Sequence, residues 1–251
     1  MTEKQIHHYK LGVVDSTQLI AKREILKLDS NQWYLWSATA QTGGYGRQGR
    51  SWFSPPNVNT YTTYGFCIPK STKFEIFSIS QVAAYSVVET LITFGIKYAK
   101  LKWPNDVLVH GKKISGALVE VTRYDCNINA ILVGISINVN TLVNDLSLIE
   151  QPATSMKALT NNQYSISEVI EVFSRHLRRN VEKFIEEGFE EFCAKINEIL
   201  YTFDGKTIAL KNDFATYLGK IEKIDENGAL RLSSCLDIPH YNGTILKEKN
   251  S

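Results

Sequence analysis

Cysteine, proline and net charge are all scarce in this sequence of 251 residues, and each shortage excludes a class of protein. Cys67, Cys126, Cys193 and Cys235 are too widely spaced for a paired metal motif, and a chain of this length needs no disulfide, so we expect four buried thiols. Six prolines and 43% hydrophobic residues exclude a disordered or fibrous chain. Because 28 Lys and Arg oppose 26 Asp and Glu, nothing favours broad binding to nucleic acid, and any anion site must be local.

Long apolar runs are also missing. No stretch approaches the roughly 20 apolar residues that cross a bilayer, and the N-terminal segment lacks the apolar core of a signal peptide. We therefore expect a cytoplasmic protein that does not bind membranes. At ~150 residues per domain, the length predicts one or two domains.

Three segments have the apolar spacing of helices. The first begins at Asp15 or Ser16 as N-cap, and the second covers residues 79–94, where the following glycine provides a C-cap. The third, residues 165–200, is mostly helical with a break at Gly188.

Six apolar runs are predicted to be strands, at residues 33–40, 61–67, 96–103, 107–109, 114–121 and 128–139. The connections between the last four are too short for parallel crossovers, so these strands form an antiparallel meander. After Leu200 the pattern changes to short alternating runs at 206–210, 217–224, 229–233 and 241–246, and Asn227-Gly228 is typical of a two-residue hairpin turn.

These elements predict an α+β protein with two domains. Residues 1–200 would hold a mixed, largely antiparallel sheet with helices packed on it. Residues 201–251 would form a small SH3-like β-barrel.

The segment 41–56 contains Gly44-Tyr45-Gly46-Arg47-Gln48-Gly49, which matches the dinucleotide motif G-x-G-x-x-G. That motif must open a helix and precede an acid by ~20 residues, whereas Pro55 and Pro56 follow here and the acid is missing. We therefore reject a dinucleotide-binding fold. The loop offers free N–H groups and the cations Arg47 and Arg50, which suit phosphate or carboxylate; a solvated surface loop is the alternative.

A second cluster, Lys102-Trp103-Pro104-Asn105-Asp106, connects two predicted strands. Its Asn can pair with a base edge and its Asp can hold a metal or accept a proton, although ordinary turn chemistry also explains it. Lys112 and Lys113 follow on a strand and point to opposite faces, so one of them could face a cleft. Ser16-Thr17 opens a helix, whose free N–H groups favour a polar or anionic ligand.

Taken together and in this order, these segments resemble the biotin protein ligases. The resemblance covers nearly the whole chain, and the Lys-Trp-Pro-Asn-Asp pentad is highly specific in combination with the loop. The matching residues are Ser16-Thr17-Gln18, Gln41, the Gly/Arg loop with Trp52-Phe53-Ser54-Pro55, the pentad, Lys113-Ile114-Ser115-Gly116, Leu118-Val119-Glu120, Gly134 and Ile137-Asn138.

The resemblance implies a two-step reaction. The carboxylate of biotin attacks the α-phosphate of ATP, with cations and Mg²⁺ offsetting the repulsion, and gives biotinyl-5′-AMP and pyrophosphate. A lysine of a biotin carboxyl carrier domain then attacks the mixed anhydride and releases AMP, while a fixed cation stabilises the oxyanion. The long loop would shield the anhydride from water. Relatives often pair through their sheets, so a homodimer is also possible.

The resemblance also implies a role for individual residues. The catalytic residues would be Lys113, Arg47 and Asp106, the last of which would assist the metal or the incoming amine; no metal ligands are assigned. Biotin would be held by Ser16, Thr17, Gln18, Gln41, Tyr45, Gly46, Arg47, Lys113 and Gly116. The nucleotide would be held by Arg47, Arg50, Trp52, Asn105, Lys113 and Asn138.

Three positions depart from the family pattern: Gln18 stands where Asn is usual, Tyr45 replaces a basic residue and Ser136 replaces a glycine. Because too few residues precede Ser16 for the DNA-binding domain of some relatives, we expect a monofunctional ligase that binds no nucleic acid. Two alternatives remain. A lipoate or octanoate ligase or transferase would need an apolar acyl slot, and a non-catalytic biotin- or adenylate-sensing module could dispense with Lys113.

Overall fold

A seven-stranded sheet with the order β1-β2-β3-β7-β6-β5-β4 forms the centre of the structure, a computed structural model that describes residues 5–70 and 76–246. From β2 to β4 every neighbouring pair in this order is antiparallel, which confirms the predicted meander. The strands are β1 (Ile6–Val14), β2 (Trp33–Gln41), β3 (Thr60–Pro69), β4 (Ala99–Lys102), β5 (Asp106–Val109), β6 (Lys112–Arg123) and β7 (Ile128–Ile137).

Strand β1 is absent from the sequence prediction and makes the sheet mixed. It pairs parallel with β2, and the crossover between them is α1 (Thr17–Glu24) with the 3-10 turn η1 (Ile25–Lys27). Most β1 side chains are exposed because it is an edge strand, so it lacks the apolar alternation that reveals a strand in sequence. The crossover starts where β1 ends, so the first turn of α1 lies beside that end of the strand.

The predicted strand at 96–103 begins three residues late, at Ala99. Gly95 adopts a left-handed φ of 83° and the N–H of Ile96 donates to the carbonyl of Leu91, so residues 95 and 96 finish the preceding helix instead of starting the strand. The position of Gly95 in the sequence predicts the cap but not how far it extends.

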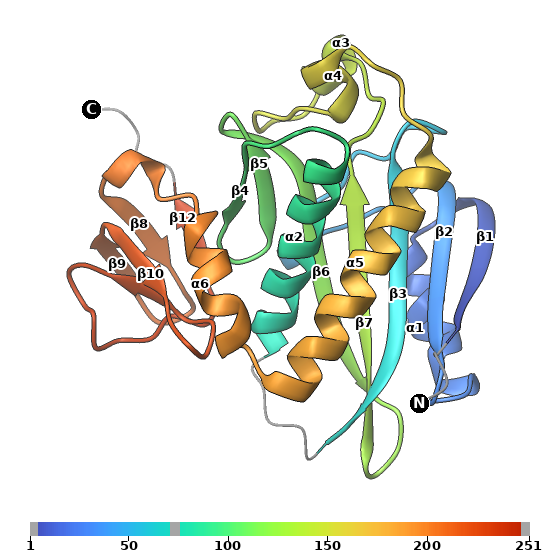
Figure 1. The fold of residues 1–251 in the computed structure, drawn as a ribbon, viewed down its shortest axis with the longest axis horizontal. Helices are drawn as coiled ribbons and strands as arrows, with labels where there is room; N and C mark the ends of the chain where they lie inside the picture. The colour runs from blue at the N-terminus through green and yellow to red at the C-terminus, as the bar shows by residue number, and fades with distance from the viewer. Residues whose placement is uncertain (1–4, 71–75, 247–251) are drawn as a thin grey trace.

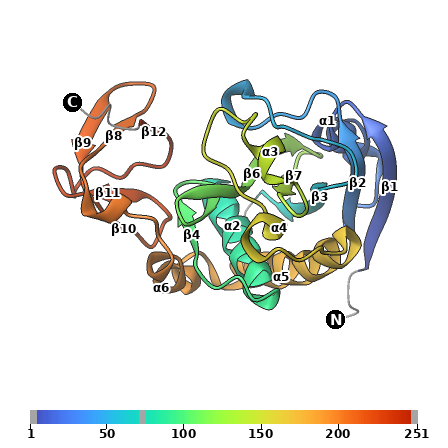
Figure 2. The same ribbon diagram turned by 90° about the horizontal axis from the view of Figure 1, so that it is seen from above.

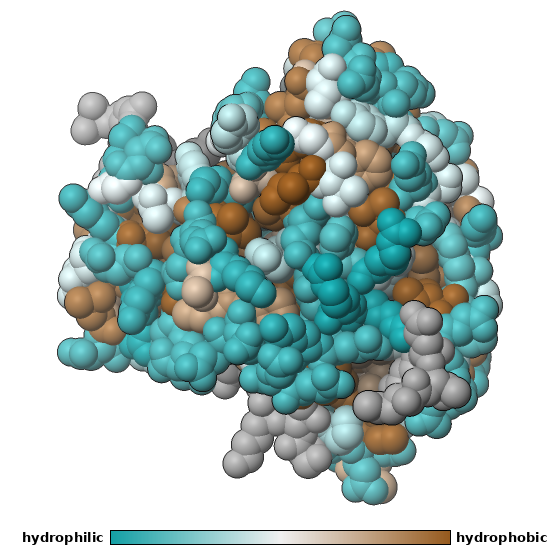
Figure 3. Space-filling view, viewed as in Figure 1, coloured by the Kyte–Doolittle hydropathy of each residue, from teal (hydrophilic) through white to brown (hydrophobic). Residues whose placement is uncertain are grey.

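Helices cover both faces of the sheet, unequally (Figure 1 and Figure 2). The long helices α2 (Ile76–Thr93) and α5 (Ile166–Glu187) pack together on one face, and α1 lies on the other. The inner side of α5 buries Val169, Phe173 and Leu177, while the side visible in Figure 3 is mainly hydrophilic. The break at Gly188 before α6 (Glu190–Glu198) is confirmed, whereas α3 (Val143–Leu146) and α4 (Met156–Thr160) were not predicted.

The C-terminal strands form two small sheets at one side of the molecule (Figure 1). The strands are β8 (Ile208–Lys211), β9 (Thr216–Gly219), β10 (Ile221–Ile224), β11 (Leu230–Leu232) and β12 (Thr244–Leu246). Their order is β12-β8-β9 in one sheet and β10-β11 in the other, so the described residues contain no closed barrel and the SH3-like barrel is not confirmed. The predicted run at 217–224 is extended but is divided into β9 and β10, because the chain passes between the two sheets at Lys220.

The Asn227-Gly228 turn and the cysteines also differ from expectation. Asp225 N–H donates to Ala229, so three residues and not two form the turn, with Gly228 at a φ of 84°. Cys126 is exposed and the other three cysteines are only partly buried, so the expectation of four buried thiols is wrong. None of the helices in the described ranges combines the length and apolarity that crossing a bilayer requires.

Candidate active site

A cavity of about 110 Å³ lies on the α1 face of the sheet, where segments far apart in sequence converge. The start of α1, the loop after β2, the β4–β5 turn and the face of β6 and β7 all contribute to its lining. The structure brings together every predicted site residue except Asn138. These are Ser16, Thr17, Gln18, Gln41, Tyr45, Gly46, Arg47, Arg50, Trp52, Asn105, Asp106, Lys113 and Gly116.

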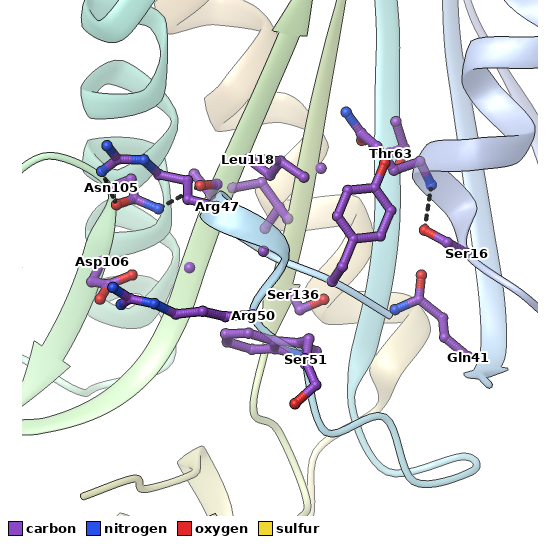
Figure 4. Close-up of a pocket in the computed structure, with 18 of the residues that line it drawn as sticks. Ser16, Gln41, Arg47, Arg50, Ser51, Thr63, Asn105, Asp106, Leu118 and Ser136 are labelled. Carbon is purple, nitrogen blue, oxygen red and sulfur yellow. Dashed lines mark hydrogen bonds between the residues drawn. The ribbon is translucent and has the colours of Figure 1, made fainter. Parts of the chain in front are cut away.

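One end of the cavity is neutral and densely hydrogen-bonded. Gln41 Oε1 accepts from the N–H of Thr17 at 2.9 Å and from its hydroxyl at 3.2 Å, while Thr63 donates to the Thr17 hydroxyl at 2.9 Å. Ser16 is the N-cap of α1, accepting from the N–H of Gln18, and all of Ser16, Thr17 and Thr63 are buried. Figure 4 shows Ser16, Gln41 and Thr63 gathered at one side of the cavity.

The other end is charged. Lys113 Nζ lies 2.7 Å from Asp106 Oδ1, and both side chains are about five-sixths buried, with exposed fractions of 15% and 16%. Lys113 also lies 5.0 Å from the centre of the Trp52 ring, a distance suited to a cation–π contact. The indole N–H of Trp52 is buried and has no hydrogen-bond partner in the described part of the chain. A donor is therefore available for a ligand beside the ammonium group.

A β-bulge explains why Lys113 and not Lys112 faces the cavity. The register of β5 and β6 shifts between Val107 and Leu108, which pair with Ser115 and Lys113, so β6 has one extra residue there. Bulges redirect a side chain relative to the strand that carries it. Lys112 is exposed, which agrees with the prediction that only one of the two lysines would reach a cleft.

Arg47 joins the charged end to the C-terminal sheets. Its guanidinium donates to Asn105 Oδ1 at 3.3 Å, to the side chain of Asn242 and to the carbonyl of Gly243 at 3.4 Å (Figure 4 shows the Asn105 bond). Thr244 also lines the cavity. Burial, and secondarily Arg50, lowers the pKa of Arg47, and Asp106 opposes that shift. A guanidinium still keeps its charge, so a partly desolvated cation faces the cavity.

The loop that carries Arg47 is an ordered hairpin. The N–H of Trp52 donates to Gly44, the N–H of Gly46 donates to Arg50, and residues Arg47–Gly49 form the 3-10 turn η2 between them. Gly44 is needed for close approach, because a Cβ there would lie 2.8 Å from both Gln41 Nε2 and Ser54 Oγ. The first glycine of the motif therefore lets the loop lie against the neutral end.

Asn138 is the predicted site residue that does not line the cavity. Asn138 is buried outside the cavity, and its amide donates to the carbonyl of Thr154 at 3.0 Å. Its predicted contact with the nucleotide therefore has no support in this arrangement. The cavity lining also includes residues that were not predicted as ligands: Gln48, Ser51, Thr62, Thr63, Ala117, Leu118, Gly134, Ile135, Ser136, Gln151 and Thr244.

A larger, more open groove of about 1200 Å³ runs between β1 and α5. Its charged side chains pair along the helix, as Arg178 does with Glu182 at 2.9 Å, and none of the predicted site residues lines it. The smaller cavity is therefore the better candidate, because hydrogen-bonding groups converge there from several elements. Within the described residues no group of three or more His, Cys, Asp and Glu side chains could enclose a metal, and Asp106 is the carboxylate that lines the cavity.

This arrangement suits a ligand that is neutral and polar at one end and anionic at the other, and it defines a site for activating and transferring an acid. The chain belongs to the biotin/lipoate A/B protein ligase family, whose model matches residues 11–140. That range includes every residue of the cavity lining except Gln151 and Thr244.

Individual relatives extend the match beyond that range. The chain is 28% identical over 222 residues to the bifunctional ligase/repressor BirA of Escherichia coli, covering 88% of this chain and 68% of that protein. It is 28% identical to the biotin–[acetyl-CoA-carboxylase] ligase of Paracoccus denitrificans, covering 88% of this chain and 92% of that protein. The solved structure of biotin protein ligase from Aquifex aeolicus in complex with biotin and ATP is 27% identical, with a TM-score of 0.78, and covers 96% of this chain and 95% of its own.

Proposed function

We propose that this chain is an ATP-dependent biotin protein ligase, which forms biotinyl-5′-AMP and transfers biotin to a lysine of a biotin carboxyl carrier domain. The observation that carries the proposal is the continuous cavity that joins a neutral hydrogen-bonding end to the cations Arg47 and Lys113. The similarity to ligases over most of the chain supports the same reaction.

The neutral end fits the ureido ring of biotin. That ring presents two N–H donors and one carbonyl acceptor, and Gln41, Thr17 and Ser16 offer carbonyl and hydroxyl groups of both kinds. Ser16 and Thr17 are buried and Gln41 is partly buried, so a ligand without the ureido ring would displace water and offer no partners for their remaining hydrogen-bonding capacity, which costs more than a missing apolar contact. The same property disfavours lipoate or octanoate, whose apolar chain has no such groups.

The first step would occur at the charged end. A carboxylate oxygen of biotin forms a bond to the α-phosphorus of ATP, and the bond from that phosphorus to the bridging oxygen breaks, so pyrophosphate leaves. Arg47 and Lys113 lie where they would offset the repulsion between the two anions and the charge on the phosphorus. Asp106 is the carboxylate that would hold Mg²⁺ together with the phosphates, and the ion would supply further charge neutralisation.

The second step uses the same groups. The acceptor amine forms a bond to the biotinyl carbon, the bond from that carbon to the phosphate oxygen breaks, and AMP leaves. Lys113 would stabilise the oxyanion, and Asp106, 2.7 Å from Lys113, is placed to take a proton from the incoming amine. The hairpin loop would keep water from the anhydride until the acceptor arrives.

The identity of the carrier domain, the absence of nucleic acid, a homodimer, a cytoplasmic location and the division at residue 200 all remain predictions.

The experiment that tests the function is a direct biotinylation assay. The protein is incubated with ATP, Mg²⁺, labelled biotin and a purified carrier domain, and labelled acceptor is separated from free biotin. We expect label on the acceptor lysine, and no label on an acceptor whose lysine is replaced by arginine. Failure to label a verified acceptor would refute the proposal.

A further inference from the structure

Two of the positions that depart from the family pattern, Gln18 and Tyr45, meet at one carboxylate. The hydroxyl of Tyr45 donates to Glu120 Oε2 at 3.3 Å, and Nε2 of Gln18 donates to the same oxygen at 3.0 Å. The other oxygen, Oε1, pairs with the exposed Lys22 at 3.3 Å. Glu120 lies on β6, outside the cavity lining, and therefore acts on the cavity only through other side chains.

The contact from Tyr45 ties the loop to the sheet at the neutral end. Tyr45 is the second residue of the hairpin motif, and its backbone bridges Ser51 within the hairpin. Burial, followed by the charge of Glu120, raises the pKa of Tyr45 to about 12, so the phenol remains a donor throughout the physiological range. At its other side the loop is tied to Asn105 and Asn242 through Arg47. The loop is thus attached to the rest of the protein at both ends of the cavity.

Gln18 helps to position the carboxylate of Glu120 that accepts the hydrogen bond from Tyr45. Gln18 is 3% exposed, its Oε1 lies 3.1 Å from the Thr63 hydroxyl, and its amide nitrogen reaches Glu120. It lies across Gly134, where a Cβ would come within 2.7 Å of Gln18 Oε1. The side chain is therefore confined between β3, β7 and Glu120, and it connects the floor of the neutral end to the carboxylate that holds Tyr45.

A ligand of the size of biotinyl-5′-AMP needs more space than the 110 Å³ of this cavity, since pockets for such ligands typically measure ~300–1,000 Å³. The loop residues Tyr45, Gly46 and Arg47 line the cavity, so lifting the loop would enlarge it for a ligand to enter or leave. The bond between Tyr45 and Glu120 joins protein atoms, so it can form before a ligand binds, and lifting the loop breaks it.

We propose that Glu120 is a positioning residue that, through Tyr45 and Gln18, holds the Gly-rich loop over the neutral end and slows escape of the activated intermediate. The proposal rests on the proposed function for its second half only. Closure of the loop is a property of the protein alone, whereas retention of biotinyl-5′-AMP requires the ligase reaction.

Trypsin cleavage after Arg47 and Arg50 measures loop opening in ligand-free protein. Since a single hydrogen bond is at stake, Tyr45→Phe and Glu120→Ala should each speed this cleavage by about fivefold. The double variant should be cleaved no faster than Glu120→Ala, because both changes break one interaction. The matched control is Lys22→Gln, which removes only the exposed ion pair on Oε1 and should be cleaved at the wild-type rate.

Dissociation of preformed biotinyl-5′-AMP provides the second readout, with the same fivefold increase expected in both single variants. Tyr45→Phe retains the aromatic ring, and thermal unfolding checks that each variant is folded. Wild-type cleavage of folded Tyr45→Phe, or effects of the two changes that multiply in the double variant, would overturn the proposal. A wild-type protein that forms no biotinyl-5′-AMP would refute the proposed function, while the cleavage rates would still test the loop contact.

Discussion

The two ends of the cavity differ in charge and are formed by different residues. At the neutral end, Thr17, Gln41 and Thr63 are uncharged and already hydrogen-bonded to one another. At the charged end, Lys113 and Asp106 form an ion pair and Arg47 is partly desolvated. Neutral bonds contribute specificity, because each unsatisfied partner is costly, whereas fixed charges change the energy of a transition state in which charge moves. The neutral end should therefore control which acid binds, and the charged end how fast it reacts.

Replacement of Lys113 should give the largest effect. Lys113→Ala removes a fixed cation from the carboxylate–phosphate junction, and we expect adenylation to slow by about 100-fold or more. Pyrophosphate release measures that rate, and the melting temperature reports on the fold. Lys112→Ala is the matched control, since Lys112 is exposed and should be replaceable without loss. A fully active Lys113→Ala protein would reduce Lys113 to an ordinary strand lysine.

Replacement of Arg47 should give the next largest effect, on retention of the intermediate. Arg47→Gly removes the attachments to Asn105 and Asn242, so we expect biotinyl-5′-AMP to dissociate about tenfold faster and to label lysines of a bystander protein. Labelling of serum albumin beside the carrier domain measures this escape. Arg175→Gly, exposed on α5, checks that loss of a surface arginine is harmless. Unchanged labelling of albumin would remove the shielding role from Arg47.

A change at the neutral end should alter binding and spare the rate. Thr17→Val keeps the shape of the side chain but loses the hydroxyl between Gln41 and Thr63, so the KM for biotin should rise about tenfold. The kcat should stay within about twofold of wild type, because the lost interaction serves substrate and transition state equally. Steady-state kinetics against biotin give both values, with Thr42→Val as an exposed control. A selective loss of kcat would contradict the division between the ends.

Replacement of Asn242, which the C-terminal segment contributes to the charged end, should give the smallest effect. Asn242→Ala removes one of the partners of Arg47 while Asn105 and Gly243 remain, so we expect the KM for ATP to rise by only about threefold. The KM for biotin should not change, since Asn242 contacts only the charged end. Asn144→Ala, exposed on α3, is the control. An equal rise in both KM values would mean that the C-terminal sheets support the whole cavity.

The sequence predicted the parts of the fold that bury one face regularly and missed those that do not. The inner stripe of α5 follows the helical period, and the antiparallel strands around β6 are continuous apolar runs. Edge strand β1 has little apolar alternation and was missed, and the residues around Lys220 were assigned to one strand because sequence alternation cannot show a change of sheet. The predicted closed barrel is not confirmed, since closure depends on pairing between distant strands, which sequence alternation does not show.

Motifs that stand in one stretch of sequence predicted residues that the structure brings together in one cavity. Arg47, Asn105 and Lys113 belong to such stretches and do meet in the cavity. Thr63 was missed because nothing in β3 distinguishes it from neighbouring threonines, and Thr244 because its place depends on how the C-terminal sheets pack. Asn138 was assigned to the nucleotide from the motif pattern, but its amide satisfies the carbonyl of Thr154.

The bond between Arg47 and Asn242 joins residues that are 195 positions apart, whereas Thr17 and Gln41 are separated by only 24. Closing a short loop costs less chain entropy, and interactions between distant residues form late in folding. The neutral end can therefore assemble from local contacts while the C-terminal sheets are still unfolded. On this basis the C-terminal partners of Arg47 would be added last, and pulsed hydrogen exchange during refolding should protect the start of α1 earlier than the residues around Asn242.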